Sequence, residues 1–281
     1  MGDGAISGLD HVLVGVRDLE GARAAYARLG FTATPRGRHI GWATANYCLM
    51  FPDDYVELIG IVDGGGFTND LDRFLARREG LMGVALASAD AEATHAGLAA
   101  RGLAAGEPTD LARDLELPEG TVRPRFRLVH LAEGASPGIP AFVCQHRSPA
   151  LVRRPAWLDH ANGAVGIAEV AVVVEQPAAL GLAYARLFGA EAIRIAGDEL
   201  RVAAGATTLA FLSVEAFAVR HPGVAIAEER PLPLGLAIAV SDLGRARALL
   251  EAGGVAHRAE AGRLRIAPEA ACGVALSFIP A

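Results

Sequence analysis

Lysine is absent from this chain, whose 26 basic residues are all arginine. Its absence excludes enzymes that hold substrates or pyridoxal phosphate through a lysine Schiff base. A Walker-type nucleotide-binding loop is excluded as well, because that motif needs a lysine before its serine or threonine. A lysine-free composition rich in alanine and arginine favours a bacterial source with a GC-rich genome.

Cysteines and long apolar runs are also scarce. The three cysteines, Cys48, Cys144 and Cys272, lie far apart without a Cys-x-x-Cys pair, so neither a zinc ribbon nor a redox dithiol is indicated. The longest apolar runs, such as residues 170–174, have the length of a strand and are too short to span a membrane. Residues 1–6 lack the basic and apolar regions of a signal peptide, so we expect a cytoplasmic protein.

The charge balance indicates what kind of partner the protein has. A formal net charge of −6 argues against a nucleic-acid partner, which would require a basic face, and leaves a small molecule. One cluster, Arg123, Arg125 and Arg127, alternates along a predicted strand, which favours charges that point outward to solvent. Alternatively, Arg127 binds the carboxylate of a substrate.

A strand–helix–three-strand pattern recurs along the chain. The first copy has strand-like residues 9–16, a helical pattern over 19–30 and strands at 40–44, 47–51 and 55–62. Further copies begin near residues 82, 167 and 234, and a glycine follows each helix, at Gly30, Gly102, Gly189 and Gly254. The sequence therefore predicts an α+β fold of four βαβββ modules.

Turn-forming residues between 147 and 163 divide these modules two and two. We expect one domain over residues 5–146, a linker over 147–163 and a second domain over 164–281. A single βαβββ module makes a curved sheet, and two together enclose a cleft. Alternate strand residues point into that cleft, and His11, on the first strand, is expected to be among them.

Several motifs resemble the vicinal oxygen chelate superfamily, in particular its glyoxalase-like branch. They are Leu-Asp-His-Val at 9–12, Gly-Arg-His-Ile-Gly-Trp-Ala-Thr-Ala-Asn at 37–46, Tyr-Val-Glu-Leu at 55–58, and the segments 142–146 and 157–163. The resemblance implies two paired domains of the glyoxalase/bleomycin-resistance/dioxygenase type, of which the C-terminal one is degenerate and either structural or a homodimer face. The fold is specified in this way, but one fold hosts many chemistries.

The resemblance also implies a divalent metal in the N-terminal cleft. Carried over residue by residue, its ligands are His11 and Glu57, with His146 as a third, and Glu57 is also the candidate catalytic residue. Cys144 shares a strand face with His146 and is the alternative ligand. The position at residues 82–83 is Met-Gly and supplies no ligand. Two histidines and a carboxylate suit iron(II), manganese, nickel or zinc.

His39, Trp42 and Asn46 are the remaining candidates for substrate binding, together with Arg127. Each has a structural alternative, such as a hydrogen-bonded core histidine or a polar hairpin edge. The predicted function is a metal-dependent lyase, isomerase or dioxygenase acting on a small vicinal-oxygen substrate. The alternative is a metal-free protein that binds or sequesters a small molecule, like bleomycin-resistance proteins. The two differ in whether His11, Glu57 and His146 converge on one point.

Overall fold

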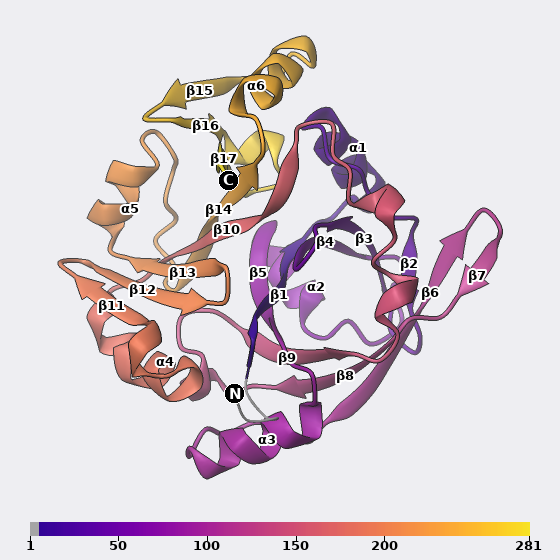
Figure 1. The fold of residues 1–281 in the computed structure, drawn as a ribbon, viewed down its shortest axis with the longest axis vertical. Coiled ribbons are helices and arrows are strands. Elements are labelled where there is room, and N and C mark those ends of the chain that lie inside the picture. Colours follow the sequence, from indigo (N-terminus) through magenta and orange to yellow (C-terminus); the bar gives the residue numbers. More distant parts are fainter. Residues whose placement is uncertain (1–5) are drawn as a thin grey trace.

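The computed structural model describes residues 6–281. Residue 5, the predicted start of the first domain, lies outside the described residues, as does most of the segment 1–6 used in the signal-peptide prediction. Four βαβββ modules follow one another along the chain and build two sheets (Figure 1), which confirms the predicted fold class.

The modules share one order of elements. The first contains β1 (Gly8–Gly15), α1 (Leu19–Arg28), β2 (Gly37–His39), β3 (Thr44–Met50) and β4 (Tyr55–Ile61). The second contains β5 (Gly80–Ala87), α3 (Ala91–Ala100), β6 (Thr109–Leu117), β8 (Arg125–His130) and β9 (Ala141–His146), with α2 (Leu71–Arg77) before it and β7 (Gly120–Val122) within it.

The C-terminal half repeats this order. The third module contains β10 (Ala164–Val173), α4 (Gly181–Phe188), β11 (Ile193–Ala196), β12 (Glu199–Ala204) and β13 (Thr207–Leu212), followed by α5 (Val214–Arg220). The fourth contains β14 (Leu232–Val240), α6 (Leu243–Ala252), β15 (His257–Glu260), β16 (Arg263–Ile266) and β17 (Ala275–Pro280). An aspartate begins α1, α3 and α6 alike, because its carboxylate accepts a hydrogen bond from a free backbone N–H of the first turn.

The two sheets differ in closure. The first has the strand order β2-β3-β4-β1-β5-β9-β8-β6-β7, and β2 also pairs with β6, so the sheet closes into a barrel. The second has the order β11-β12-β13-β10-β14-β17-β16-β15 and is open within the described chain. Its strands occupy the upper left of Figure 1, and the barrel lies at the right and below. Only the first sheet thus encloses its inner face on all sides.

The main hydrophobic core lies outside the barrel, between the two sheets and their helices. Val12 of β1 and Val170 of β10 belong to it, and the buried rings of Tyr26 and Tyr184 anchor α1 and α4 there. The residues 147–163 that connect the sheets are themselves partly buried, and His160 Nε2 donates a hydrogen bond to the backbone oxygen of Met50. The barrel interior is therefore lined by side chains that do not belong to this main core.

Four segments differ from the sequence-based expectations. Residues 40–44, predicted as a strand, mostly form a turn, because Gly41 adopts a φ of 78° and Ile40 is exposed. The strand β6 and the helices α2 and α5 were not predicted.

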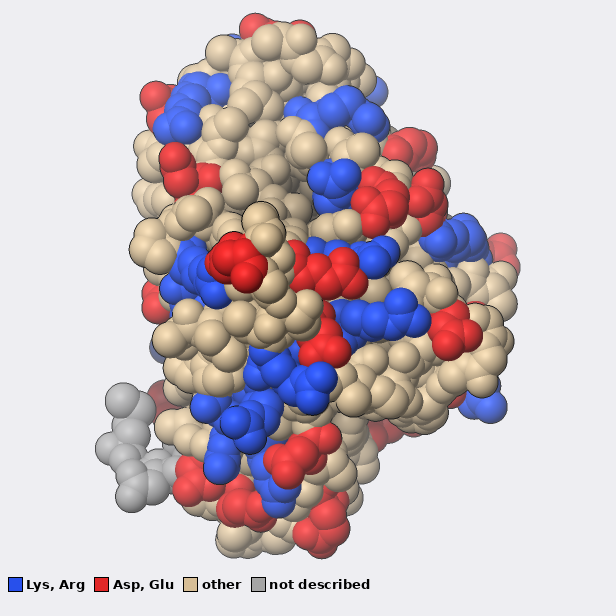
Figure 2. Space-filling view, turned by 90° about the vertical axis from the view of Figure 1, so that its right-hand side faces the viewer, with Lys and Arg blue, Asp and Glu red and all other residues tan. Residues whose placement is uncertain are grey.

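No helix among residues 6–281 is long and apolar enough to cross a membrane. Basic and acidic side chains intermingle over the face in Figure 2, in keeping with the modest net charge.

Candidate functional site

His11 and Glu57 lie side by side on the inner face of the barrel. Strands β1 and β4 are parallel neighbours in which His11 pairs with Tyr55 and Leu13 with Glu57, so strand alternation turns both polar side chains inward. His11 Nε2 lies 3.3 Å from Glu57 Oε2, and both residues are buried. The His11 ring also stacks on Tyr55, with 4.3 Å between the ring centroids.

Asp10 also faces the barrel interior, although simple alternation would place it opposite His11. The pairing of β1 with β5 shifts between Leu9 and His11, which leaves Asp10 as the extra residue of a β-bulge. Its carboxylate accepts a hydrogen bond from His11 Nδ1 at 2.6 Å. The bulge therefore creates a buried chain of groups, from Asp10 through His11 to Glu57.

The three groups determine one another's ionisation. Burial alone would raise the pKa of Asp10, but hydrogen bonds from His11 and His146 hold it well below its ordinary value. Burial likewise opposes the charge on Glu57, yet its contact with His11 lowers the pKa of Glu57 to about 2. Burial would lower the pKa of His11, but the two carboxylates outweigh it and raise that pKa. The interior thus favours an imidazolium between two carboxylates.

His39 and Asn46 complete the surroundings of Glu57. Asn46 Nδ2 donates to Glu57 Oε1 and lies 3.4 Å from His39 Nε2, so that His39 nitrogen is the acceptor. The other ring nitrogen, Nδ1, then carries the proton and donates to Thr44 Oγ1 at 2.8 Å. Burial lowers the pKa of His39 to about 4, which is consistent with a neutral ring.

Arg113 is a buried cation that the sequence reasoning did not single out. It projects from β6, is only 3% exposed, and its Nη1 donates to Cys48 Sγ at 3.1 Å. Its positive charge helps to hold Glu57 ionised. Together with the His11 imidazolium, it balances the two buried carboxylates, so the barrel interior encloses no large uncompensated charge.

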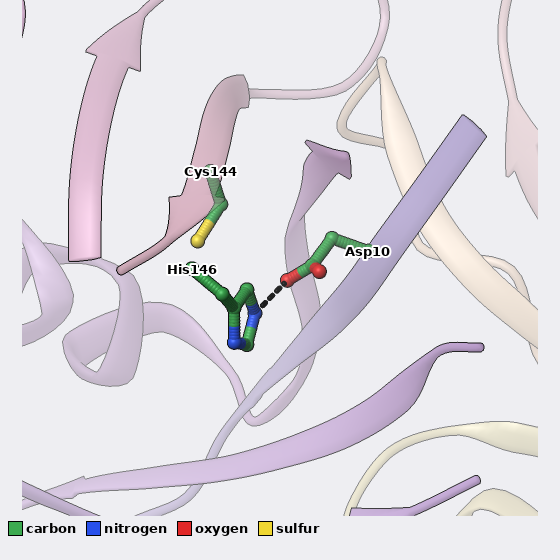
Figure 3. A group of neighbouring side chains, drawn as sticks. All are labelled: Asp10, Cys144 and His146. Atoms are coloured by element: carbon green, nitrogen blue, oxygen red, sulfur yellow. Dashed lines mark hydrogen bonds and ion pairs between the residues drawn. The ribbon is translucent and has the colours of Figure 1, made fainter. Parts of the chain in front are cut away.

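A second group, which we call the end cluster, consists of Asp10, Cys144 and His146. Cys144 and His146 project from β9 toward Asp10 (Figure 3), and one potential ligand atom from each residue lies within 4.8 Å of the others. His146 Nε2 lies 3.1 Å from Asp10 Oδ2. Asp10 therefore links this cluster to the His11–Glu57 pair.

The structure divides the predicted metal-ligand set between these two groups. His11 and Glu57 are neighbours, whereas His146 is the partner of Asp10 in the end cluster. Across residues 6–281, one set of three potential ligand atoms lies within 4.8 Å of one another, that of the end cluster, and it includes neither His11 nor Glu57.

The predicted substrate-binding residues are divided as well. His39 and Asn46 contact Glu57, and the Trp42 ring lies 5.6 Å from the ring of His39. Arg127 is not at the site: it points to the outer face of β8 and forms ion pairs with Glu92 and Asp110. Its neighbours Phe126 and Leu128 take the inner positions, which is why alternation excludes Arg127 from the barrel.

A small cavity of about 60 Å³ lies against His11, His39 and Glu57 and is otherwise lined mainly by apolar side chains. That volume holds about two water molecules. It adjoins a cleft of about 550 Å³ past Trp42 and Phe126, and another of about 570 Å³ past Met82. A ligand of ordinary size would therefore place one polar end in the cavity and the rest in a cleft.

The sequence profile of the Glyoxalase-like domain family matches residues 9–188. The chain belongs to this family. The match begins beside Asp10 and His11, covers the whole barrel and ends with α4. No match was found among curated proteins.

Solved structures share the glyoxalase-like architecture at low sequence identity. A hypothetical protein from Staphylococcus aureus matches with a TM-score of 0.70 and 12% identity, over 97% of this chain and 99% of that chain. A mutant of 4-hydroxymandelate synthase from Streptomyces coelicolor matches with a TM-score of 0.62 and 13% identity, over 98% and 92% of the two chains. A xylose isomerase-like TIM barrel/4-hydroxyphenylpyruvate dioxygenase fusion protein gives 0.54 and 15%, over 99% of this chain and 49% of that one. These likenesses show the fold, and with the family match they confirm membership of the vicinal oxygen chelate superfamily.

In this glyoxalase-like barrel, the second module contributes little to a metal site beside His11 and Glu57. Met82 lines the cavity with a thioether, and Phe142 lines it with an apolar ring. The first module therefore offers two donors with their hydrogen bonds already made, and this pair alone does not fit a closed set of metal ligands.

Proposed function

We propose that the protein binds a small, oxygenated organic molecule inside the N-terminal barrel, in direct contact with His11 and Glu57. This is the metal-free alternative of the sequence-based predictions. The observation that carries it is that the close group of potential ligand atoms around His146 leaves out His11 and Glu57, whereas the predicted metal site would need all three residues in one group.

The cavity's chemistry supports this kind of ligand. A charged pair at the base of an apolar cavity interacts strongly with a polar ligand group, because water screens it little. The Glu57 carboxylate can accept a further hydrogen bond from a ligand hydroxyl, and the His11 Nε2–H that faces Glu57 can be shared with a neighbouring ligand oxygen. Adjacent oxygens on one ligand match this donor and acceptor 3.3 Å apart.

The test is a binding screen of purified, metal-depleted protein against diols, keto acids and catechols, followed by calorimetric titration of the best ligand. We expect the Glu57→Gln variant, which keeps the side-chain shape but removes the charge, to bind at least about tenfold more weakly, or about 1.4 kcal/mol. The Arg127→Gln variant, altered on the outer face, serves as the matched control and should bind like wild type. Equal affinity of all three proteins would refute a role for Glu57.

A metal-dependent enzyme is the second candidate, favoured by one observation. Asp10 accepts a hydrogen bond from His11 Nδ1 at 2.6 Å, and histidines that bind metals commonly donate their other nitrogen to a carboxylate in this way. His11 and Glu57 would then occupy two positions around a divalent ion, which would supply Lewis-acid chemistry to the substrate. If the protein is a metal-dependent enzyme, the metal-depleted protein should bind the ligand only after metal is added.

A further inference from the structure

The end cluster of Asp10, Cys144 and His146 contains three types of metal-binding side chain in one place. The three come from two strands that are far apart in sequence and separated in the sheet by β5. Neither His11 nor Glu57 belongs to this group. The ligand site proposed above therefore does not explain why these three side chains lie together.

The local backbone accounts for how the cluster forms. Strand alternation on β9 turns Cys144 and His146 to the same inner face, and the bulge in β1 turns Asp10 toward them. Strand β5 lies between β1 and β9. Its Ala85 pairs with His11 and packs in one apolar cluster with Cys144. A methyl side chain at this position leaves room for the longer groups on either side to approach one another.

One polar atom of the cluster has an unmet hydrogen-bonding capacity. His146 Nδ1 is buried and has no hydrogen-bond partner within residues 6–281. Such orphaned buried nitrogens are uncommon in native proteins and call for a bound group or a water. The Cys144 sulfur lies nearby and is buried as well.

We propose that the end cluster binds one divalent ion of the zinc type, through the Asp10 carboxylate, the Cys144 thiolate and a ring nitrogen of His146. Zinc accepts this mixture of oxygen, sulfur and nitrogen ligands and keeps a fourth position for water. On binding, the Cys144 thiol loses its proton to solvent and the sulfur bonds to the metal. The thiolate and the Asp10 carboxylate place two negative charges beside the doubly charged ion.

This inference goes beyond the proposed function, and the two sites are neighbours, because the Asp10 carboxylate also accepts a hydrogen bond from His11 Nδ1. The ion would lie in the end cluster, whereas the proposed ligand contacts His11 and Glu57. Loss of ligand binding without loss of zinc, or loss of zinc without loss of ligand binding, distinguishes the failure of one proposal from the failure of the other.

The experiment uses the full chain, stripped with a chelator under reducing conditions and then titrated with cobalt(II) or zinc. In wild type we expect one zinc per chain after desalting, by elemental analysis, and a near-ultraviolet absorption from cobalt bound to thiolate. The Cys144→Ser variant should lose that absorption and the Asp10→Asn variant should lose stoichiometric zinc. The Cys48→Ser variant, altered at another buried cysteine of the same barrel, should retain both.

Two results would overturn the proposal. One is a wild-type protein that retains no zinc or whose cobalt spectrum lacks the thiolate absorption, a measurement that does not depend on any variant folding. The other is zinc that survives Cys144→Ser but disappears with Glu57→Gln, which would place the ion at the His11–Glu57 pair instead.

Discussion

Asp54 connects the barrel to the second sheet and should make the protein's stability depend on pH. It lies in the turn before β4, is 5% exposed, and its carboxylate accepts hydrogen bonds from Ile167 N of β10 at 3.1 and 3.2 Å. Burial raises its pKa from 3.8 to about 7, and the hydrogen bonds from Ile167 only partly oppose the rise.

The raised pKa of Asp54 determines how stability changes with pH. Because the folded state holds the proton more tightly than the unfolded state, the group's contribution to stability is complete below pH 3.8 and is lost as the pH rises to about 7. Each pH unit in this window changes the free energy of unfolding by about 1.4 kcal/mol. Between pH 5 and pH 8, wild type should therefore lose about 3 kcal/mol that a neutral side chain would retain.

The Asp54→Asn variant isolates this effect, because an amide of the same size can still accept from Ile167. Urea unfolding at several values between pH 5 and pH 8 should show the variant gaining stability relative to wild type as the pH rises. The Asp53→Asn variant, at the exposed neighbouring residue, is the matched control and should show a much smaller change. A stability difference between Asp54→Asn and wild type that stays constant with pH would refute the reasoning.

Two further predictions concern packing. In Gly37→Ala, the added methyl group would clash with Asn46 Oδ1, so we expect a loss of about 1–3 kcal/mol in urea unfolding and weaker ligand binding, because Asn46 supports Glu57. The Gly64→Ala variant, at a glycine with open space around it, is the control, and equal losses in both would contradict the clash. Tyr26→Phe removes the hydrogen bond from the buried Tyr26 hydroxyl to Ala271 O at 3.2 Å and should lower stability by about 1 kcal/mol, whereas an unchanged unfolding midpoint would show that the bond is not stabilising.

The sequence predicts the fold well because its repeat is carried by local signals. Four helical patterns, each followed by a glycine, and apolar strand-length runs between them indicate the βαβββ modules directly. The short helix α2 lacks such signals. In β6, a residue period of two places Leu111, Arg113 and Leu115 on one face, and this alternation was the available clue to the buried arginine.

The site is predictable only as far as regular strand geometry extends. The proximity of His11 and Glu57 follows from two inward-facing positions on neighbouring strands. The inward turn of Asp10 does not, because it depends on a bulge that shifts the pairing with β5. That one extra residue gives His146 a carboxylate partner in Asp10, which a residue-by-residue transfer of a ligand set could not anticipate.

The central claim is that ligand contacts the His11–Glu57 pair directly, and calorimetric titration of the best ligand with and without metal tests it most directly. Wild type stripped of metal should bind with the same affinity as wild type loaded with zinc, and the Glu57→Gln variant should bind more weakly in both states. Binding that appears only after metal is added, and that is lost in the Glu57→Gln variant, would contradict direct contact and establish a metal-centred site.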